Sequence, residues 1–284
     1  MDTDIMQKYL EAGRIASKVR NETAKAVEDN MRLIDIAEYS ENLIYEMGAK
    51  AAFPCNISVN EIASHYTPEY GIQRIAADDL VKIDIGVHID GYIADTATTI
   101  EVGTNRNNIL IRAAEKALDA AIKIIREDIN TKQLGTVIEN VIKSYNCTSV
   151  TDLTGHSIDR YTIHSGINIP NQANTSFGNT LHAGDVIAIE PFTTLGPGRI
   201  KQGETRIFGL LHNKKQNHPE YQNLLSQFNT LPFTRRWMQN PDKLEKIRQF
   251  LRRYPVLIES DGYPVAQTEH TIIVNKHGCR VITD

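Results

Sequence analysis

The chain has 284 residues, with 31 lysines and arginines against 35 aspartates and glutamates, so its formal net charge is −4. Hydrophobic residues make up 41% and charged residues 23% of the sequence, which argues against disordered, collagen-like and coiled-coil chains. No apolar run reaches the roughly 18 residues of a membrane helix, and the polar first residues do not resemble a signal peptide. We therefore expect a cytoplasmic protein with a large core and no membrane contact.

The three cysteines are Cys55, Cys147 and Cys279, an odd number without CxxC spacing. Neither a disulfide framework nor a zinc knuckle is indicated by this pattern. We expect buried thiols.

The predicted elements alternate between helices and strands along the chain. Hydrophobic residues recur at helical spacing from Ile5 to Val19, and a second helix is expected over residues 35–47, ended by Gly48. Further helices are predicted at 108–125 and 136–143, and strands at 81–88, 92–100, 185–190, 264–274 and 280–282. This order, with its hairpin signals and without a linker, favours one α+β domain over residues 1–284 with an antiparallel sheet.

Residues 210–254 differ from the rest by combining helical patterning with three prolines, Pro219, Pro232 and Pro241. We interpret them as an inserted helical subdomain. Between Arg235 and Arg253 seven basic residues stand against two acidic ones, so the local charge is 7 − 2 = +5. Such a segment is either a solvated helix face or a docking surface for an acidic partner such as RNA.

The most informative stretch surrounds Asp90-Gly91, a strong signal for a two-residue hairpin turn. With the turn there, Gly86 pairs with Asp95 and Asp84 pairs with Ala97. Asp84 and Asp95 then share one face of the sheet as diagonal neighbours, about 7–8 Å apart at the backbone.

The glycine at position 86 is expected to leave the space over this face empty. Two carboxylates facing one vacancy repel each other unless a cation lies between them. The hairpin alone leaves open the alternative that Asp84 and Asp95 are simply exposed to solvent.

Other side chains favour a cation. Glu190 and Glu269 adjoin apolar strands, where an uncompensated charge is costly to bury, and His156 offers a neutral nitrogen. Four carboxylates and one imidazole suit two divalent ions of Mn, Fe, Co or Zn. Such a pair activates a bridging water and polarises a carbonyl, so amide hydrolysis is the implied reaction.

Six segments, in order, resemble those of type 2 methionine aminopeptidases. They are NEIASHYTP at 60–68, DIGVHIDGYIADTA at 84–97, GHSI at 155–158, IHSG at 163–166, IEPF at 189–192 and TEHT at 268–271. The likeness spans nearly the whole chain and is to the shorter archaeal form, which lacks a charged N-terminal extension. It implies the pita-bread fold, a dinuclear metal site on the central antiparallel sheet, and a winged-helix-like insertion at 210–254.

The resemblance implies a role for each matching residue. The metal ligands would be Asp84, Asp95, His156, Glu190 and Glu269. Asp95 and Glu269 match the carboxylates that bridge the metals, and Glu190 also matches the proton shuttle.

Four further positions match substrate-binding residues of the family. His65 and His164 resemble the two histidines that hold the scissile amide and support the oxyanion. Phe53 and Ile163 match positions that line the pocket for the methionine side chain.

The implied activity is removal of the initiator methionine from nascent chains when the second residue is small, through a metal-bridged hydroxide. The two metals would come from Co, Mn, Fe, Zn or Ni. The expected partners are nascent N-termini and, through the basic insert, the ribosome, and the chain is expected to be a monomer.

Two other functions are compatible with parts of the sequence. A non-catalytic relative binding RNA or protein through the insert is disfavoured, because all five ligands and both histidines are present. The proline-specific peptidase branch shares the metal ligands, but the segment His65-Tyr66-Thr67-Pro68 and the insert favour the methionine branch.

Overall fold

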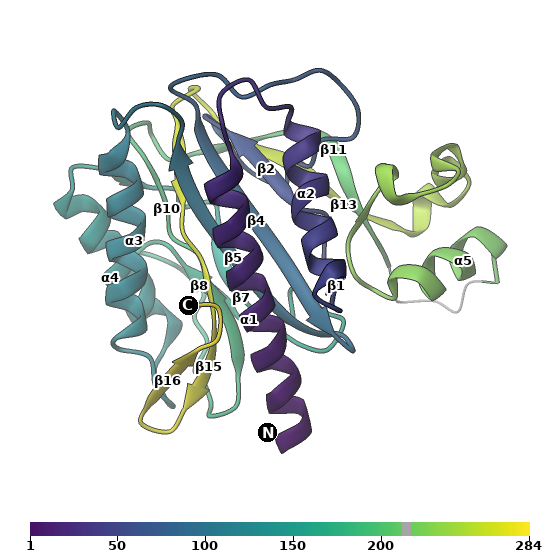
Figure 1. The fold of residues 1–284 in the computed structure, drawn as a ribbon. Helices are drawn as coiled ribbons and strands as arrows, with labels where there is room; N and C mark the ends of the chain where they lie inside the picture. Colours follow the sequence, from purple (N-terminus) through teal and green to yellow (C-terminus); the bar gives the residue numbers. More distant parts are fainter. Residues whose placement is uncertain (212–216) are drawn as a thin grey trace.

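The structure is a computed structural model that describes residues 1–211 and 217–284. Four helices lie over the same side of the sheets: α1 (Thr3–Ala26), α2 (Leu33–Glu46), α3 (Asn108–Ile122) and α4 (Thr131–Ser144). A fifth helix, α5 (Pro219–Phe228), stands apart at one end of the molecule (Figure 1).

The N-terminal sheet is built around β4 (Leu80–Ile89), which pairs with β1 (Lys50–Ala51), β2 (Asn56–Val59) and β5 (Tyr92–Glu101). Asp90 and Gly91 have φ angles of 50° and 88°, both positive, as a two-residue type I′ turn requires. Gly86 pairs with Asp95 and Asp84 with Ala97, so the predicted hairpin register is confirmed.

The C-terminal half contains two more sheets. One has the order β16-β15-β9-β7-β8, with β7 (Thr154–Ile158), β8 (Asn168–Pro170), β9 (Val186–Ile189), β15 (His270–Asn275) and β16 (Gly278–Val281). The other has the order β14-β10-β6, with β6 (Thr148–Ser149), β10 (Phe192–Thr194) and β14 (Val265–Gln267). All pairings are antiparallel, as predicted.

Strand β5 joins the two halves. Ala97 forms an antiparallel bridge with Glu269, in which the Glu269 N–H donates to the Ala97 carbonyl at 3.0 Å. Nearby, the Thr271 hydroxyl Oγ1 lies 2.7 Å from both the N–H and the carbonyl oxygen of Asp95. The seam between the halves therefore runs past the predicted carboxylates.

The last sheet, β12-β11-β13-β3, carries the insert. Its strands are β3 (Ile62–Ser64), β11 (Ile200–Leu210), β12 (Phe233–Thr234) and β13 (Leu251–Glu259), and two 3₁₀ helices follow β12, η1 (Arg235–Trp237) and η2 (Pro241–Phe250). The prediction of a helical segment through residue 254 was wrong at its C-terminal end, because residues 251–254 belong to β13. Residues 212–216 of the predicted insert lie outside the described residues, and its winged-helix-like character stays a prediction.

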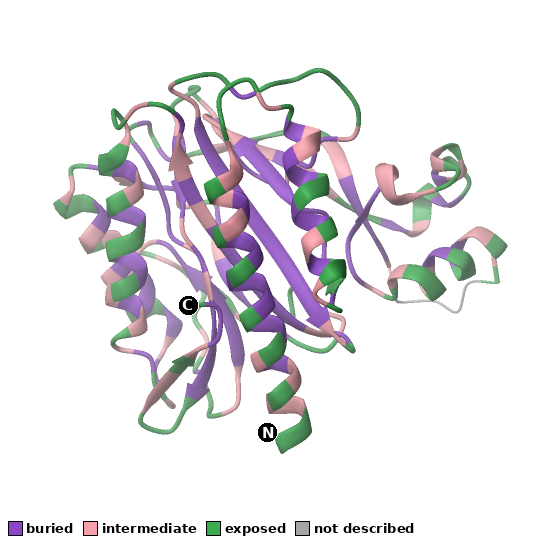
Figure 2. Ribbon diagram, in the orientation of Figure 1, coloured by how far each residue is buried: buried purple, intermediate pink, exposed green. Residues whose placement is uncertain are grey.

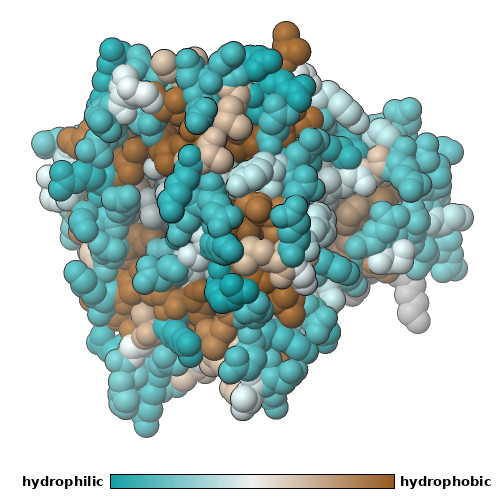
Figure 3. All heavy atoms as spheres, viewed as in Figure 1, coloured by the Kyte–Doolittle hydropathy of each residue, from teal (hydrophilic) through white to brown (hydrophobic). Residues whose placement is uncertain are grey.

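The hydrophobic core lies between the sheets and the helices. Val81, Ile83, Ile85 and Val87 alternate along β4 and are fully buried, and α1 packs against β4 and β5 on this side (Figure 2). A second cluster lies beneath α3 and α4. The helix side of the molecule is mostly hydrophilic, with hydrophobic side chains visible between the polar ones (Figure 3). Alternation along the strands leaves Asp84 and Asp95 on the opposite face.

Two element predictions differ from the structure for identifiable reasons. Helix α4 begins at Thr131 rather than 136, because Asn130 caps it and forms a capping box with Gln133. The single strand predicted over 264–274 is interrupted between Gln267 and His270, because β14 pairs with β10 whereas β15 pairs with β9.

The three cysteines differ in burial. Cys55 and Cys147 are buried free thiols, as expected, whereas Cys279 is partly exposed.

Within residues 1–211 and 217–284, no helix has the length and apolar character needed to cross a membrane.

Candidate functional site

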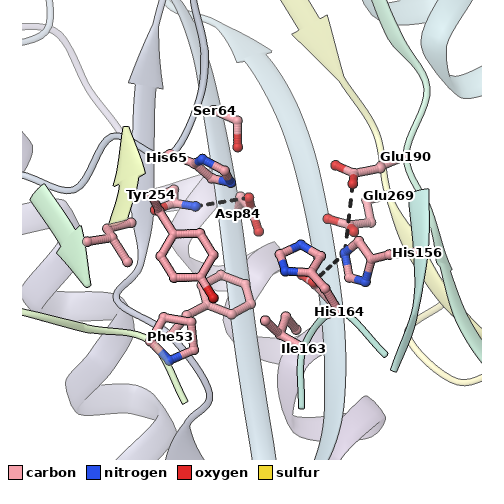
Figure 4. A pocket seen from close by; sticks show the side chains of 14 residues that line it. Phe53, Ser64, His65, Asp84, His156, Ile163, His164, Glu190, Tyr254 and Glu269 are labelled. Atoms are coloured by element: carbon pink, nitrogen blue, oxygen red, sulfur yellow. Dashed lines mark hydrogen bonds and ion pairs between the residues drawn. The ribbon is translucent and has the colours of Figure 1, made fainter. Parts of the chain in front are cut away.

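A pocket of about 430 Å³ opens on the sheet face opposite α1 and α2, at the seam between the halves (Figure 4). Every site residue predicted from the sequence lines it: Phe53, His65, Asp84, Asp95, His156, Ile163, His164, Glu190 and Glu269. The fold thus brings together residues that lie as far apart as 53 and 269 in the chain.

Each acidic or imidazole group is carried by a strand or a strand end. Asp84 and Asp95 stand in the middle of β4 and β5, and His156 stands in the middle of β7. Glu190 follows β9 directly, and Glu269 occupies the gap between β14 and β15. Because both halves contribute side chains, the site forms only where the two halves meet.

The nitrogen and oxygen atoms of this group lie close together. His156 Nε2 is 3.6 Å from Asp95 Oδ2 and 3.8 Å from Glu190 Oε1. Asp95, His156 and Glu269 each offer a possible ligand atom, and these atoms lie within 4.8 Å of one another. Figure 4 shows Asp84 on the other side of the same space.

Burial makes the carboxylates hard to ionise. It raises the pKa of Asp84 to about 6. Burial, followed by repulsion from acidic neighbours, raises the pKa values of Asp95, Glu190 and Glu269 well above the usual range. Four crowded carboxyl groups of this kind favour a bound positive charge.

Unpartnered oxygens provide a direct test of whether a cation fits. Asp84 Oδ1, Asp95 Oδ1 and Glu269 Oε1 are buried and have no hydrogen-bond partner. Buried polar atoms are normally satisfied, so these oxygens need a ligand from outside the chain. Carboxylate oxygens with one imidazole suit divalent transition metals, and the residues present therefore fit a divalent cation.

The two predicted non-ligand histidines flank the acidic group. His65 has a positive φ of 61°, an uncommon conformation for a residue with a side chain, and its Nδ1 donates to the Pro255 carbonyl at 3.2 Å. The centre of the His164 ring lies 4.3 Å from the centre of the His156 ring. Burial lowers the pKa of His65 to about 4 and that of His164 well below its usual value, so both rings are neutral near pH 7.

The hydrogen bond to Pro255 fixes which nitrogen of His65 carries the proton. A carbonyl oxygen only accepts, so the proton is on Nδ1, and Nε2 of the neutral ring is an acceptor. His65 can therefore receive an N–H group, which suits the predicted contact with an amide.

An apolar wall completes the pocket. Phe53 and Ile163 belong to it, together with Ile207, Pro232 and Tyr254. The expectation of empty space over Gly86 was wrong, because a Cβ atom at this position would lie 2.2 Å from Cε1 of Phe53. The glycine makes room for the Phe53 ring.

Sequence reasoning missed several polar and aromatic residues. Asn56 Nδ2 donates to Asp84 Oδ2 at 3.1 Å, and Gln267 Nε2 donates to Glu190 Oε2 at 3.1 Å. Asn56 interrupts an apolar stretch, which is a signal that could have been used. Ser64 and Tyr254 also line the pocket, and their surrounding sequence gives no comparable signal.

Residues 7–276 match the sequence model of metallopeptidase family M24. The chain belongs to this family. It is 42% identical to the methionine aminopeptidase of Pyrococcus horikoshii over the full length of both chains. Among solved structures, a thermophilic Arx1 superposes with a TM-score of 0.85 at 22% identity, covering 99% of this chain and 91% of that one.

The methionine aminopeptidase of Thermotoga maritima superposes with a TM-score of 0.77 at 21% identity, covering 100% of this chain and 98% of that one. The structural similarities confirm the pita-bread fold that the motifs implied, and the 42% identity confirms the resemblance to methionine aminopeptidases. The role of each pocket residue remains a prediction.

Proposed function

We propose that this M24 protein is a metal-dependent methionine aminopeptidase that removes the initiator methionine from nascent chains with a small second residue. The main support is one pocket that combines a buried carboxylate and imidazole cluster, two neutral histidines and an apolar wall. Identity of 42% along the whole chain to a methionine aminopeptidase adds to it.

Two divalent ions, drawn from Co, Mn, Fe, Zn or Ni, would be held by five residues: Asp84, Asp95, His156, Glu190 and Glu269. When bound, such ions lower the pKa of a water molecule and polarise a carbonyl group.

The chain's own residues would then position the substrate and move the proton. Gln267 fixes Oε2 of Glu190, which leaves Oε1 to receive a proton from the attacking water and return it to the leaving amine. His65 Nε2 would accept the N–H of the scissile amide, and His164 would donate to the oxyanion. Phe53 and Ile163 would contact the thioether side chain.

The first test is release of methionine from Met-Ala-Ser by metal-stripped protein with and without added Mn or Co, followed by chromatography. We expect release only with metal. Absence of release with every divalent metal tried, from protein with normal circular dichroism, would contradict the proposal and favour a binding function.

The proposed second-residue specificity has its own test. The resemblance implies a tight space for the second residue, beyond the methionine subsite that Phe53 and Ile163 would line. We expect kcat/KM for Met-Leu-Ser to fall about 100-fold below that for Met-Ala-Ser, since overpacking a closed site costs about 1–3 kcal/mol. Equal rates would remove the size restriction, and cleavage of Leu-Pro instead would favour the proline-specific branch.

The proposed setting is the cytoplasm, where nascent chains emerge, with the protein as a monomer. Contact of the insert with the ribosome would rely on fewer charges than the sequence suggests, because part of the insert's positive charge is neutralised. Arg236 pairs with Glu41 and is only 8% exposed at its side chain, and Lys243 pairs with Glu220. The expectation that Arg236 belongs to a basic surface was wrong.

A further inference from the structure

A second pocket adjoins the candidate site on the side of the insert. It is open to solvent, spans about 1000 Å³, and shares Ile163, His164 and Tyr254 with the first pocket. Figure 4 shows these three side chains bordering the space in front of the acidic cluster. The two pockets therefore adjoin at these three side chains, and we call the second one the outer groove.

The outer groove carries positive charge from Arg160 and Arg252. None of the described residues that line it is acidic, and neither arginine forms an ion pair with a described carboxylate. This differs from Arg236 and Lys243 on the insert, which both have acidic partners.

Arg160 is held in place without losing its terminal donors. Its Nε donates to the Asp90 carbonyl at 2.9 Å, and its guanidinium lies 5.3 Å from the Tyr92 ring centre and 5.5 Å from that of Tyr161. Asp90 pairs with Lys8, and one oxygen of Asp159 accepts the backbone N–H of Arg160. Arg160 also borders a third pocket, which Asp159 and Asp185 line, but neither carboxylate forms an ion pair with its guanidinium. A fixed guanidinium with open N–H groups is suited to a carboxylate.

The substrate itself supplies an occupant for this groove. An aminopeptidase removes one residue, so the remaining polypeptide must continue away from the pocket. His164, which would contact the scissile amide, is a wall of both spaces. An extended chain advances about 3.3 Å per residue, so the residues after the second would reach the groove within a few steps.

We propose that the outer groove binds the third to fifth residues of the substrate and that Arg160 and Arg252 make acidic side chains favourable there. This inference rests on the proposed aminopeptidase function and extends it to a charge preference downstream of the cleaved bond.

The test compares Met-Ala-Asp-Glu-Asp, Met-Ala-Ser-Gln-Ser and Met-Ala-Lys-Lys-Lys as substrates. We expect kcat/KM to fall in that order, by about tenfold between the acidic and basic peptides at low salt, as two exposed charge pairs allow. The difference should reside in KM, because contacts remote from the bond act equally on substrate and transition state. It should shrink in 0.5 M NaCl as the charges are screened.

Variants of the groove sharpen the comparison. Arg252→Gln should reduce the acidic preference, and Arg252→Glu, whose new carboxylate balances the charge of Arg160, should abolish it. Arg253→Gln is the matched control, because Arg253 is equally exposed on β13 but does not line the groove, and successive strand residues point to opposite faces. It should keep the wild-type preference. Circular dichroism would verify that each variant is folded.

The outcomes separate this inference from the function on which it rests. Two results would contradict binding of acidic substrate residues in the outer groove: equal kcat/KM for the three peptides, or the same loss of acidic preference in Arg252→Gln and Arg253→Gln. Methionine release would still support the aminopeptidase in either case. Failure to release methionine from all three peptides would instead contradict the proposed function itself.

Discussion

At the scale of single residues, Gly86 and Phe53 determine the shape of the apolar wall. The Gly86→Ala variant places a methyl group where Cε1 of Phe53 would be only 2.2 Å away, so the ring must move. We expect a loss of about 1–3 kcal/mol in unfolding free energy and a higher KM for Met-Ala-Ser. Urea unfolding and steady-state kinetics measure the two effects.

Gly278→Ala provides the control for that substitution, because a Cβ atom there meets nothing within 4 Å. It should have wild-type stability and KM. An unchanged KM in Gly86→Ala would show that the Phe53 ring does not shape the methionine site.

The role proposed for His65, acceptance of the scissile amide N–H, can be tested separately from the roles of the metal ligands. His65→Ala removes the acceptor proposed for the scissile amide but leaves the carboxylates and His156 in place. We expect kcat to fall about 100-fold with metal binding retained, which is typical for loss of one preorganised contact. Calorimetric metal titration would accompany the kinetics, with His182→Ala as an exposed histidine control. A variant with full turnover would exclude His65 from the reaction.

At the scale of elements, one buried ion pair attaches the insert to the N-terminal body. Arg236 in η1 makes two hydrogen bonds to Glu41 in α2, at 2.5 and 2.8 Å. The same carboxylate accepts the indole N–H of Trp237 and the backbone N–H of Cys55. Cys55 lies two residues beyond Phe53, so this contact connects the insert to the pocket wall.

Removing one partner of this pair should strongly reduce the free energy of unfolding. Glu41→Ala leaves the Arg236 guanidinium buried without its carboxylate, which costs about 3–5 kcal/mol of unfolding free energy. Adding Arg236→Met should recover part of the loss, since no charge then stays buried. Glu220→Ala, which breaks a more exposed pair with Lys243, should cost no more than about 1 kcal/mol. Similar losses for the two glutamate variants would refute a special role for the buried pair.

At the scale of the whole molecule, a bound metal would tie the two halves together. The predicted ligands come from β4 and β5 on one side and from β7 and the ends of β9 and β14 on the other. A metal at 100 times its dissociation constant should therefore add about 2.7 kcal/mol to stability and raise the melting temperature.

The stabilisation should also depend on pH. Because burial raises the pKa values of these carboxyl groups, to about 6 for Asp84, they hold protons at low pH that must leave when metal binds. The rise in melting temperature on adding Mn to chelator-treated protein should be larger at pH 8 than at pH 6. Glu269→Ala should abolish it. An equal rise in this variant would place the metal elsewhere.

Much of the fold and most of the candidate site were predictable from local patterns. Alternation over β4 and β5 and the Asp90-Gly91 turn were sufficient for the register that puts Asp84 beside Asp95. These features depend on residues two to four positions apart, whose relation is fixed by backbone geometry. The ordered motifs similarly pointed to the residues that line the pocket.

The remaining features of the fold and the site depend on contacts between residues that are distant in the chain. The Phe53 ring covers Gly86, Glu41 neutralises Arg236, and a single predicted strand divides between two partners around Glu269. In each case the deciding neighbour is distant in the chain, so neither periodicity nor charge counting could identify it. Local sequence patterns were sufficient to identify which side chains share a face of each strand. What those faces contact is known only from the folded chain, because long-range contacts depend on shape and burial rather than on spacing.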